Sequence, residues 1–174
     1  MEKLITMKKL LLPIIFVLFY FKAGAQTVAT DSTPKKSTVK TLNSKQYNAL
    51  LNGDDLYGMA LVAELNHYPN PEKVIKFKKD LDLSPIQLNK LIAINKELHR
   101  KKLEMGLIII RNERTLDSLF HTKKLDNGTL IFYANRYGLY QGELRNAILQ
   151  ACLVTRDLLS QQQINKFEAL QKGI

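Results

Sequence analysis

Three histidines and one glutamate are the side chains of this sequence best suited to bind a metal ion. His67, His99 and His121 lie far apart in the chain. No two of them are four residues apart, the spacing that places two imidazoles on one face of a helix. Glu64 could share a helical face with His67, but Pro69 ends that helix soon afterwards. These four residues are candidates for a metal site assembled from distant parts of the chain; surface or capping histidines are the alternative.

No pattern typical of an active site is present in the sequence. It contains no phosphate-binding P-loop, no Gly-x-Ser-x-Gly nucleophile elbow and no His-Glu-x-x-His metal motif. Serine, histidine and aspartate occur, but at no spacing that singles out a nucleophile. We therefore expect neither catalysis nor a bound cofactor.

Apolar and aromatic side chains on two expected helices could instead form a contact surface. Residues 105–110, Met-Gly-Leu-Ile-Ile-Ile, are apolar on more sides than an amphipathic helix requires. This predicts either a two-sided core beneath short helices or an exposed patch that binds a partner. Farther along the chain, tyrosines alternate with arginines. These tyrosines could also either pack in the core or form a contact surface. The candidate contact residues are Met105, Ile108, Ile109, Ile110, Tyr133, Arg136, Tyr137 and Tyr140.

A long helix is expected to carry the first of these groups. Ser84, with Pro85 at the first helical position and Gln87 two residues later, forms a capping box, in which each side chain bonds the other residue's backbone amide. The apolar residues that follow recur at three- and four-residue steps: Leu88, Leu91, Ile92, Leu98, Met105, Ile109, Leu116 and Leu119. The pattern predicts a helix to Phe120, about 54 Å long if unbroken, with a bend at Gly106.

A second long helix is expected to carry the tyrosines. Asp126 can cap its start, and Lys123 and Lys124 lie where cations complement the end of the preceding helix. The expected inward stripe is Leu130, Tyr133, Ala134, Tyr137, Tyr140, Leu144, Ile148, Ala151 and Leu158. Ser160 then begins a short last helix through a second capping box, with Gln163.

Short helices are expected before this pair. Asn43 caps one that Gly53 ends, and Asn70 caps another with Pro71 at its first position. No convincing strand pattern appears. We therefore expect an all-α fold, a long antiparallel helical hairpin with short flanking helices. So thin a layer leaves one broad face open, and we expect it to form a homodimer or to present that face to another molecule.

The first 25 residues have the pattern of a signal peptide. Lys8 and Lys9 precede an apolar run at residues 10–21, and Ala-Gly-Ala at residues 23–25 suits signal peptidase. We expect cleavage after Ala25 and export to the periplasm; an uncleaved anchor is the alternative. Residues 26–41, rich in Thr, Ser, Lys and Pro, are expected to be a disordered leader. Residues 42–172 then form the helical domain.

The charge of the chain and its single cysteine limit the partners and the covalent cross-links that we expect. The chain has 26 Lys and Arg against 16 Asp and Glu, a net charge of +10, which favours contact with anionic membranes or acidic polypeptides. No nucleic-acid motif is present, so we expect no nucleic-acid partner. Cys152 is the only cysteine, so no intramolecular disulfide can form, and we expect it to be a buried apolar residue.

Two phrases at helix starts share a leading leucine, a serine cap and a glutamine. They are Leu83-Ser84-x-x-Gln87 and Leu159-Ser160-x-x-Gln163. Together they resemble the LTxxQ signature of the Spy and CpxP periplasmic proteins, with serine in place of threonine in both copies. The stretch at residues 58–69 is also similar to one that precedes the motif in a branch of that family. The resemblance spans roughly residues 42–170.

This resemblance implies a hairpin subunit that forms a thin curved dimer. Spy is an ATP-independent chaperone that holds unfolded clients, and CpxP represses an envelope-stress sensor kinase. Relatives in the wider superfamily are periplasmic sensors of heavy metals. The resemblance therefore implies an exported holdase for unfolded envelope proteins. The alternatives are a sensor for heavy-metal resistance and a CpxP-like stress-response ligand of a membrane-bound regulator.

Overall fold

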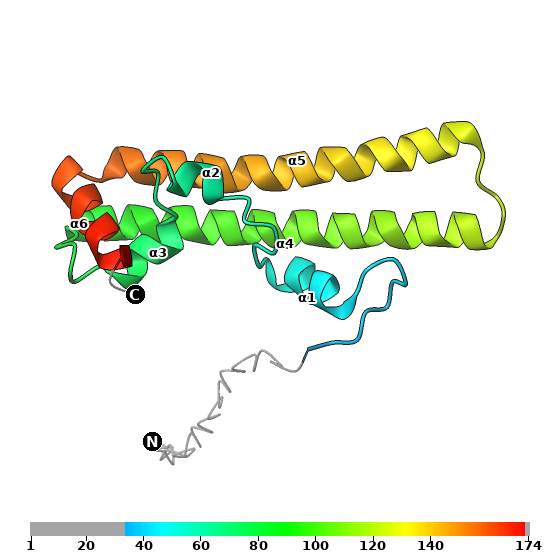
Figure 1. The fold of residues 1–174 in the computed structure, drawn as a ribbon, viewed down its shortest axis with the longest axis horizontal. Helices are drawn as coiled ribbons and strands as arrows, with labels where there is room; N and C mark the ends of the chain where they lie inside the picture. The colour runs from blue at the N-terminus through cyan, green and yellow to red at the C-terminus, as the bar shows by residue number, and fades with distance from the viewer. Residues whose placement is uncertain (1–33, 173–174) are drawn as a thin grey trace, which may run out of the picture. The chain divides into compact units, whose positions relative to one another are not determined.

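The computed structural model describes residues 34–172, and all regular structure in that range is helical. The helices are α1 (Ser44–Asn52), α2 (Leu61–Glu64), α3 (Pro71–Lys76), α4 (Pro85–His121), α5 (Asn127–Leu158) and α6 (Gln161–Lys172). α4 and α5 form a long antiparallel hairpin, with α3 and α6 at its open end, α1 against α4 and α2 against α5 (Figure 1). The predicted all-α hairpin is confirmed.

The predicted signal peptide and most of the predicted leader lie outside the described residues. Within the described range, no helix combines the length and the apolar character needed to span a bilayer. The last part of the leader differs from the prediction, because it packs on the domain. Val39 is buried with Leu42 against Tyr47 and Ile110. Apolar contact thus orders this part of a segment whose composition alone suggested disorder.

The two predicted serine capping boxes are present, and the predicted cap Asn43 forms a third box with Gln46. At α4, the Ser84 Oγ accepts from the Gln87 amide at 3.1 Å, and Gln87 Oε1 accepts from the Ser84 amide at 3.0 Å. Ser160 and Gln163 make the same two bonds at α6. Asn43 begins α1 in the same way. These local bonds satisfy amides that the first helical turn leaves without a partner, and so fix where each helix begins.

The glutamines of the two serine capping boxes also form hydrogen bonds with each other, a contact that the sequence did not predict. Gln87 Nε2 donates to Gln163 Oε1 at 2.9 Å, and Gln163 Nε2 donates to Gln87 Oε1 at 3.2 Å. Gln87 Nε2 also donates to the Leu158 carbonyl, and Gln163 Nε2 to the Leu81 carbonyl. We call this arrangement the glutamine clasp. It joins the starts of α4 and α6, so the two phrases share one structural role.

An apolar cluster surrounds the clasp at the open end of the hairpin. Its buried members are Val74, Leu81, Leu91, Leu159, Ile164 and Phe167. The Phe77 and Phe167 rings meet edge to face, with centroids 5.9 Å apart. Both leading leucines of the repeated phrases contact this cluster. α3 and α6 are therefore held to the hairpin by apolar packing as well as by the clasp.

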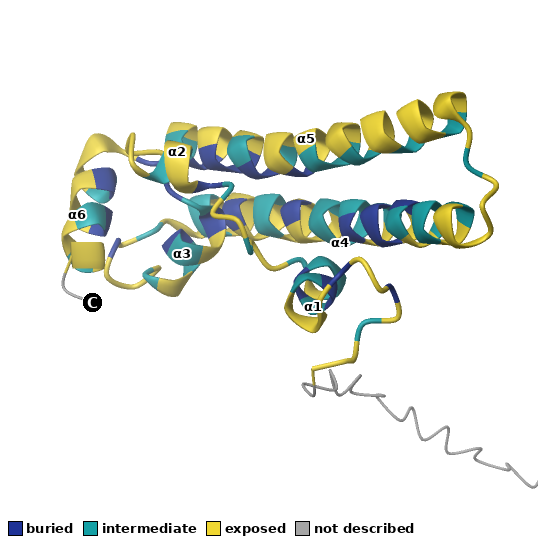
Figure 2. Ribbon diagram, turned by 45° about the vertical axis from the view of Figure 1, so that its right-hand side comes forward, coloured by how far each residue is buried: buried dark blue, intermediate teal, exposed yellow. Residues whose placement is uncertain are grey.

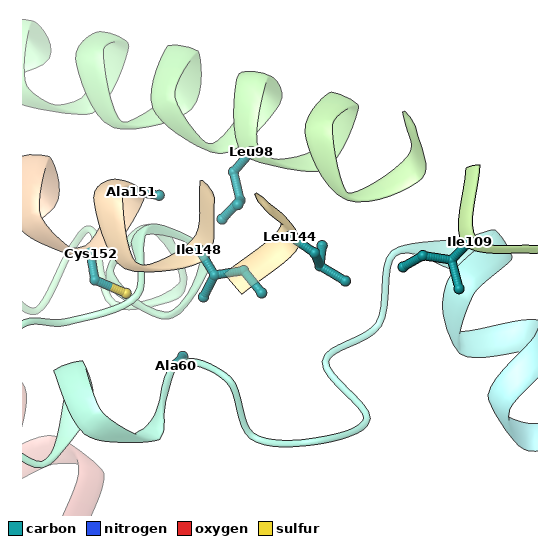
Figure 3. Packing of buried hydrophobic residues seen from close by; sticks show 7 residues of the cluster. All are labelled: Ala60, Leu98, Ile109, Leu144, Ile148, Ala151 and Cys152. Carbon is teal, nitrogen blue, oxygen red and sulfur yellow. The ribbon is translucent and has the colours of Figure 1, made fainter. Parts of the chain in front are cut away.

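A second cluster, which we call the hairpin cluster, lies between α4, α5 and the segment that leads into α2 (Figure 3). Its members are Ala60, Leu98, Ile109, Leu144, Ile148, Ala151 and Cys152. Cys152 is fully buried, as expected. Burial, with a smaller contribution from Glu64, raises the pKa of its thiol to about 11. Cys152 is thus a neutral apolar residue of the core.

Gly106 allows a close approach between helices in continuous α4. A Cβ at this position would lie 2.0 Å from the carbonyl oxygen of Leu50 in α1. Only glycine therefore permits the observed contact between the α1 backbone and α4. From the sequence alone, we explained Gly106 by a bend in its own helix. The structure gives a different reason for the glycine, which is the close approach of α1.

The predicted inward stripes are buried over only part of the hairpin. On α5 burial begins at Leu144, whereas Leu130 and Ala134 are exposed, and on α4 Ile92 is also exposed. Figure 2 shows this change along α5 from the turn toward the open end. We call residues 107–142 the tip, and we call α2, α3, α6 and the adjoining parts of α4 and α5 the base. The helical spacing predicted these stripes, but no third helix of the described residues covers α5 in the tip.

Candidate binding surface

The structure does not bring the three histidines together. His99 and His121 lie on α4 and are 22 residues apart, about 33 Å along the helix axis. His67 lies before α3 and pairs with Glu168 of α6. Among residues 34–172, no group of three or more His, Cys, Asp or Glu side chains could hold a metal ion. The three histidines are all exposed, as the alternative of surface histidines expected, and the candidate metal site is not assembled among these residues.

The remaining metal candidate, Glu64, has a different partner. Its carboxylate forms an ion pair with Lys73, with 2.8 Å between Oε1 and Nζ. The partner lies on α3, so this contact ties the end of α2 to the next helix. Glu64 thus has a structural role in the base.

The apolar run at residues 105–110 is mainly core. Ile109 belongs to the hairpin cluster, and Ile110 lies beneath the ordered end of the leader. Both are buried, so the prediction that they form an exposed contact surface is wrong. Met105 and Ile108 are half-buried, and Leu107 is exposed. The two-sided core was the correct interpretation, because α5 covers one side of this segment and α1 another.

The tyrosines of α5 divide between core and surface. Tyr137 and Tyr140 both pack against the hairpin cluster, and the Tyr137 hydroxyl accepts from Gln141 Nε2 at 3.2 Å. Tyr133 and Tyr140, together with Arg136, line a groove between α4 and α5. With Ile108, which also lines this groove, four of the predicted contact residues therefore meet at one place.

We call this depression the tip groove. Its lining residues are Ile108, Arg111, Asn112, Thr115, Phe132, Tyr133, Arg136 and Tyr140. The buried Asn112 amide donates from Nδ2 to the backbone carbonyl of Tyr133 at 3.1 Å. This bond satisfies a polar group in the floor and fixes α4 against α5.

Arg136 lies between two aromatic rings of its own helix. Its guanidinium carbon is 4.9 Å from the centroid of the Phe132 ring and 5.4 Å from that of Tyr140. Its Nε also donates to the Tyr140 hydroxyl at 2.7 Å. These contacts hold a cation over apolar surface while leaving other guanidinium N–H groups free to donate.

Ion pairs of the described residues all lie outside the tip. They join Lys73 to Glu64, Lys76 to Glu72, Arg100 to Glu97 and Glu104, Lys101 to Glu104, Lys166 to Asp82 and His67 to Glu168. Two of the three tip carboxylates have other partners. Glu113 accepts from the Thr41 hydroxyl, and Asp126 caps α5. Arg114 donates to the Thr38 hydroxyl at 2.9 Å, and no cation of the tip forms an ion pair with a described carboxylate.

Large apolar side chains are exposed on the same part of the molecule. They are Leu107, Phe120, Leu130, Ile131, Phe132 and Leu139, with exposed fractions of 37–58%. A second exposed apolar group lies around α2: Tyr57, Leu61, Val62, Leu65 and Tyr68. Carboxylates, at Asp54, Asp55 and Glu64, accompany this second group in the chain. Of these three carboxylates, Glu64 is already paired with Lys73.

Several groove residues were missed from the sequence. Phe132, Arg136 and Tyr140 are four residues apart in succession and so share a helical face, a signal that could have identified Phe132. Arg111 and Thr115 show the same spacing on α4. Their position opposite Phe132 depends on how the two helices pack, which their spacing does not reveal.

Comparison with known proteins gives no family assignment. No protein-family model, curated protein or solved structure matches the chain.

Proposed function

We propose that the protein is an exported, ATP-independent holdase that binds unfolded envelope proteins through its tip. The observation that carries this proposal is the combination, in residues 107–142, of exposed apolar side chains and cations without described ion pairs. Apolar surface of this kind binds exposed apolar segments of clients. Cations raise the rate of encounter with acidic ones.

The arrangement of the hairpin supports this proposal. A holdase without a nucleotide cycle needs several weak contacts on a surface whose own folding does not depend on them. The tip meets this need because its exposed side chains lie on helices that the base holds in place. The paired Leu-Ser-x-x-Gln phrases, the export signal and the resemblance to Spy and CpxP proteins add support. A homodimer is part of the proposal, because the hairpin is only one layer of helices thick.

Suppression of client aggregation tests the proposal. The protein, purified from cells that express its full sequence, should suppress aggregation of a chemically denatured client in the absence of nucleotide. Ile131→Ser/Phe132→Ser should weaken this suppression, because the exposed side chains contribute apolar contact area. Leu61→Ser/Leu65→Ser removes comparable exposed side chains from the α2 surface and is the matched control. No suppression by the unaltered protein at stoichiometric excess would contradict the proposal.

The choice of positions matters for this test. Substitution of Ile109 or Ile110 would disrupt the core, so lost activity would only report unfolding. Ile131 and Phe132 are about half exposed, so their replacement should leave helicity and the midpoint of thermal unfolding nearly unchanged. Circular dichroism checks both.

A further inference from the structure

The tip groove carries two positive charges and no negative one. Arg111 projects from α4 and Arg136 from α5, so each helix contributes one guanidinium to the lining. No Asp or Glu lines the groove. Neither arginine forms an ion pair with any carboxylate of residues 34–172. A ligand in the groove therefore meets uncompensated positive charge.

Arg136 is already held in position. Its contacts with Phe132 and Tyr140 restrict a side chain that otherwise has many rotamers. Less conformational entropy is then lost when a carboxylate binds. The Tyr140 hydroxyl engages only part of a guanidinium that has five N–H donors. The remaining donors are available to an acidic ligand.

Apolar surface lies directly beside these cations. Ile108 and Tyr133 are half-buried in the lining, and the Phe132 ring is about half exposed. The polar Asn112 amide in the floor is already bonded to the α5 backbone. A ligand that suits the groove therefore combines an apolar side chain with an adjacent anionic group.

We infer that the tip groove selects extended client segments in which Asp or Glu adjoins an aromatic or aliphatic residue. Charge complementarity identifies this occupant, because the lining has two arginines, apolar side chains and no carboxylate. The α2 surface lacks this complementarity, since Asp54 and Asp55 adjoin it in the chain and its Glu64 is paired with Lys73. The inference rests on the proposed holdase function and specifies which clients the tip prefers.

Fluorescence anisotropy with two peptides tests the selection. One peptide repeats Asp-Phe, and the other replaces each Asp with Asn, which is similar in size but uncharged. The protein should bind the acidic peptide about tenfold more tightly at low salt, as two charge-assisted contacts would provide. This preference should fall as salt screens the exposed charges.

Matched variants show whether the groove is responsible. Arg111→Gln/Arg136→Gln should abolish the preference for the acidic peptide. Lys96→Gln/Arg145→Gln removes the same charge from α4 and α5 outside the groove and should retain most of it. Circular dichroism must show that both variants fold. An equal loss in the two variants would overturn the inference, because net charge alone would then explain the preference.

The outcomes separate this inference from the proposed function. If the protein suppresses aggregation but binds both peptides equally, the selection is wrong while the holdase function stands. If it prefers the acidic peptide through the groove but suppresses no aggregation, the peptide selectivity stands while the holdase function fails. Binding to phosphatidylglycerol vesicles that depends on the groove, without peptide preference, would overturn the inference in favour of a membrane surface.

Discussion

The base and the tip of the hairpin use the same two helices in different ways. In the base, α2, α3 and α6 pack on α4 and α5, and apolar clusters, the glutamine clasp and three ion pairs between segments join them. In the tip, α5 has no buried residue, and its large apolar side chains remain open to solvent. The base therefore carries most of the packing between helices, and we propose that the tip provides the contact surface.

The glycines of α4 and α5 show the same contrast. Gly106 touches the backbone of α1, whereas a Cβ at Gly138 or Gly142 would meet nothing within 4 Å. One glycine is required by packing, while the other two lower the intrinsic stability of an uncovered helix. The tip is therefore less crowded and has weaker helix propensity at these two positions.

Truncation of a buried and an exposed isoleucine should show the largest difference between the regions. Ile148→Ala leaves a cavity in the hairpin cluster and should lower the free energy of unfolding by about 4 kcal/mol. Ile131→Ala in the tip should change it by about 0.5 kcal/mol or less. Urea unfolding measures both. Similar losses at the two positions would show that the tip is packed as tightly as the base.

Alanine at two glycines should give opposite effects. Gly106→Ala should lower the free energy of unfolding by about 3 kcal/mol, because α1 must move away from α4. Gly138→Ala should raise it by about 1 kcal/mol, because alanine favours the helix and meets no neighbour. The same urea titrations measure this. A stable Gly106→Ala protein with unchanged α1 contacts would refute the observed approach of the two helices.

The glutamine clasp should appear as coupling between two distant residues. Gln87→Ala and Gln163→Ala should each lower the free energy of unfolding by about 2 kcal/mol. The double variant should lose about 1 kcal/mol less than the sum, because either single change already breaks the shared bonds. A double-mutant cycle by urea unfolding measures the coupling. Simple additivity would mean that each glutamine acts only in its own capping box.

Loss of a serine cap should have the smallest effect on stability among the substitutions in the base. Ser84→Ala and Ser160→Ala should each cost about 1 kcal/mol of unfolding free energy. Neither change should alter suppression of client aggregation, because both caps lie in the base. A large loss of suppression in a variant that remains folded would place function in the base instead.

Local features of this fold could be predicted, but long-range contacts could not. Ser84, Asn70 and Asp126 were identified as caps because a cap depends on residues three or fewer positions away. Gln87 and Gln163 are 76 residues apart, and only the folded hairpin brings their amides together. Periodicity likewise gave the inward stripe of α5. It could not show that Leu130 lacks a covering element, because this depends on where the short helices lie.

The residues of the candidate surface likewise divide into those that local sequence could identify and those that depend on long-range packing. Tyr133, Arg136 and Tyr140 were recognised from their interleaved types and spacing. Ile109 and Ile110 were ambiguous, since an apolar run suits either a two-sided core or an open patch. Arg111 belongs to the groove only because α4 places it opposite α5. Residue types thus pointed to a candidate contact surface on these two helices. Packing determined which of the residues line it.

Site-specific photo-crosslinking to a bound unfolded client tests most directly whether the tip is the contact surface. A photoreactive residue is placed at Phe132 in the tip or at Leu61 on the α2 surface, two positions of similar exposure. We expect crosslinks to the client chiefly from position 132, with few from position 61. Crosslinking that is equal at the two positions, or stronger from position 61, would contradict the assignment of client binding to the tip.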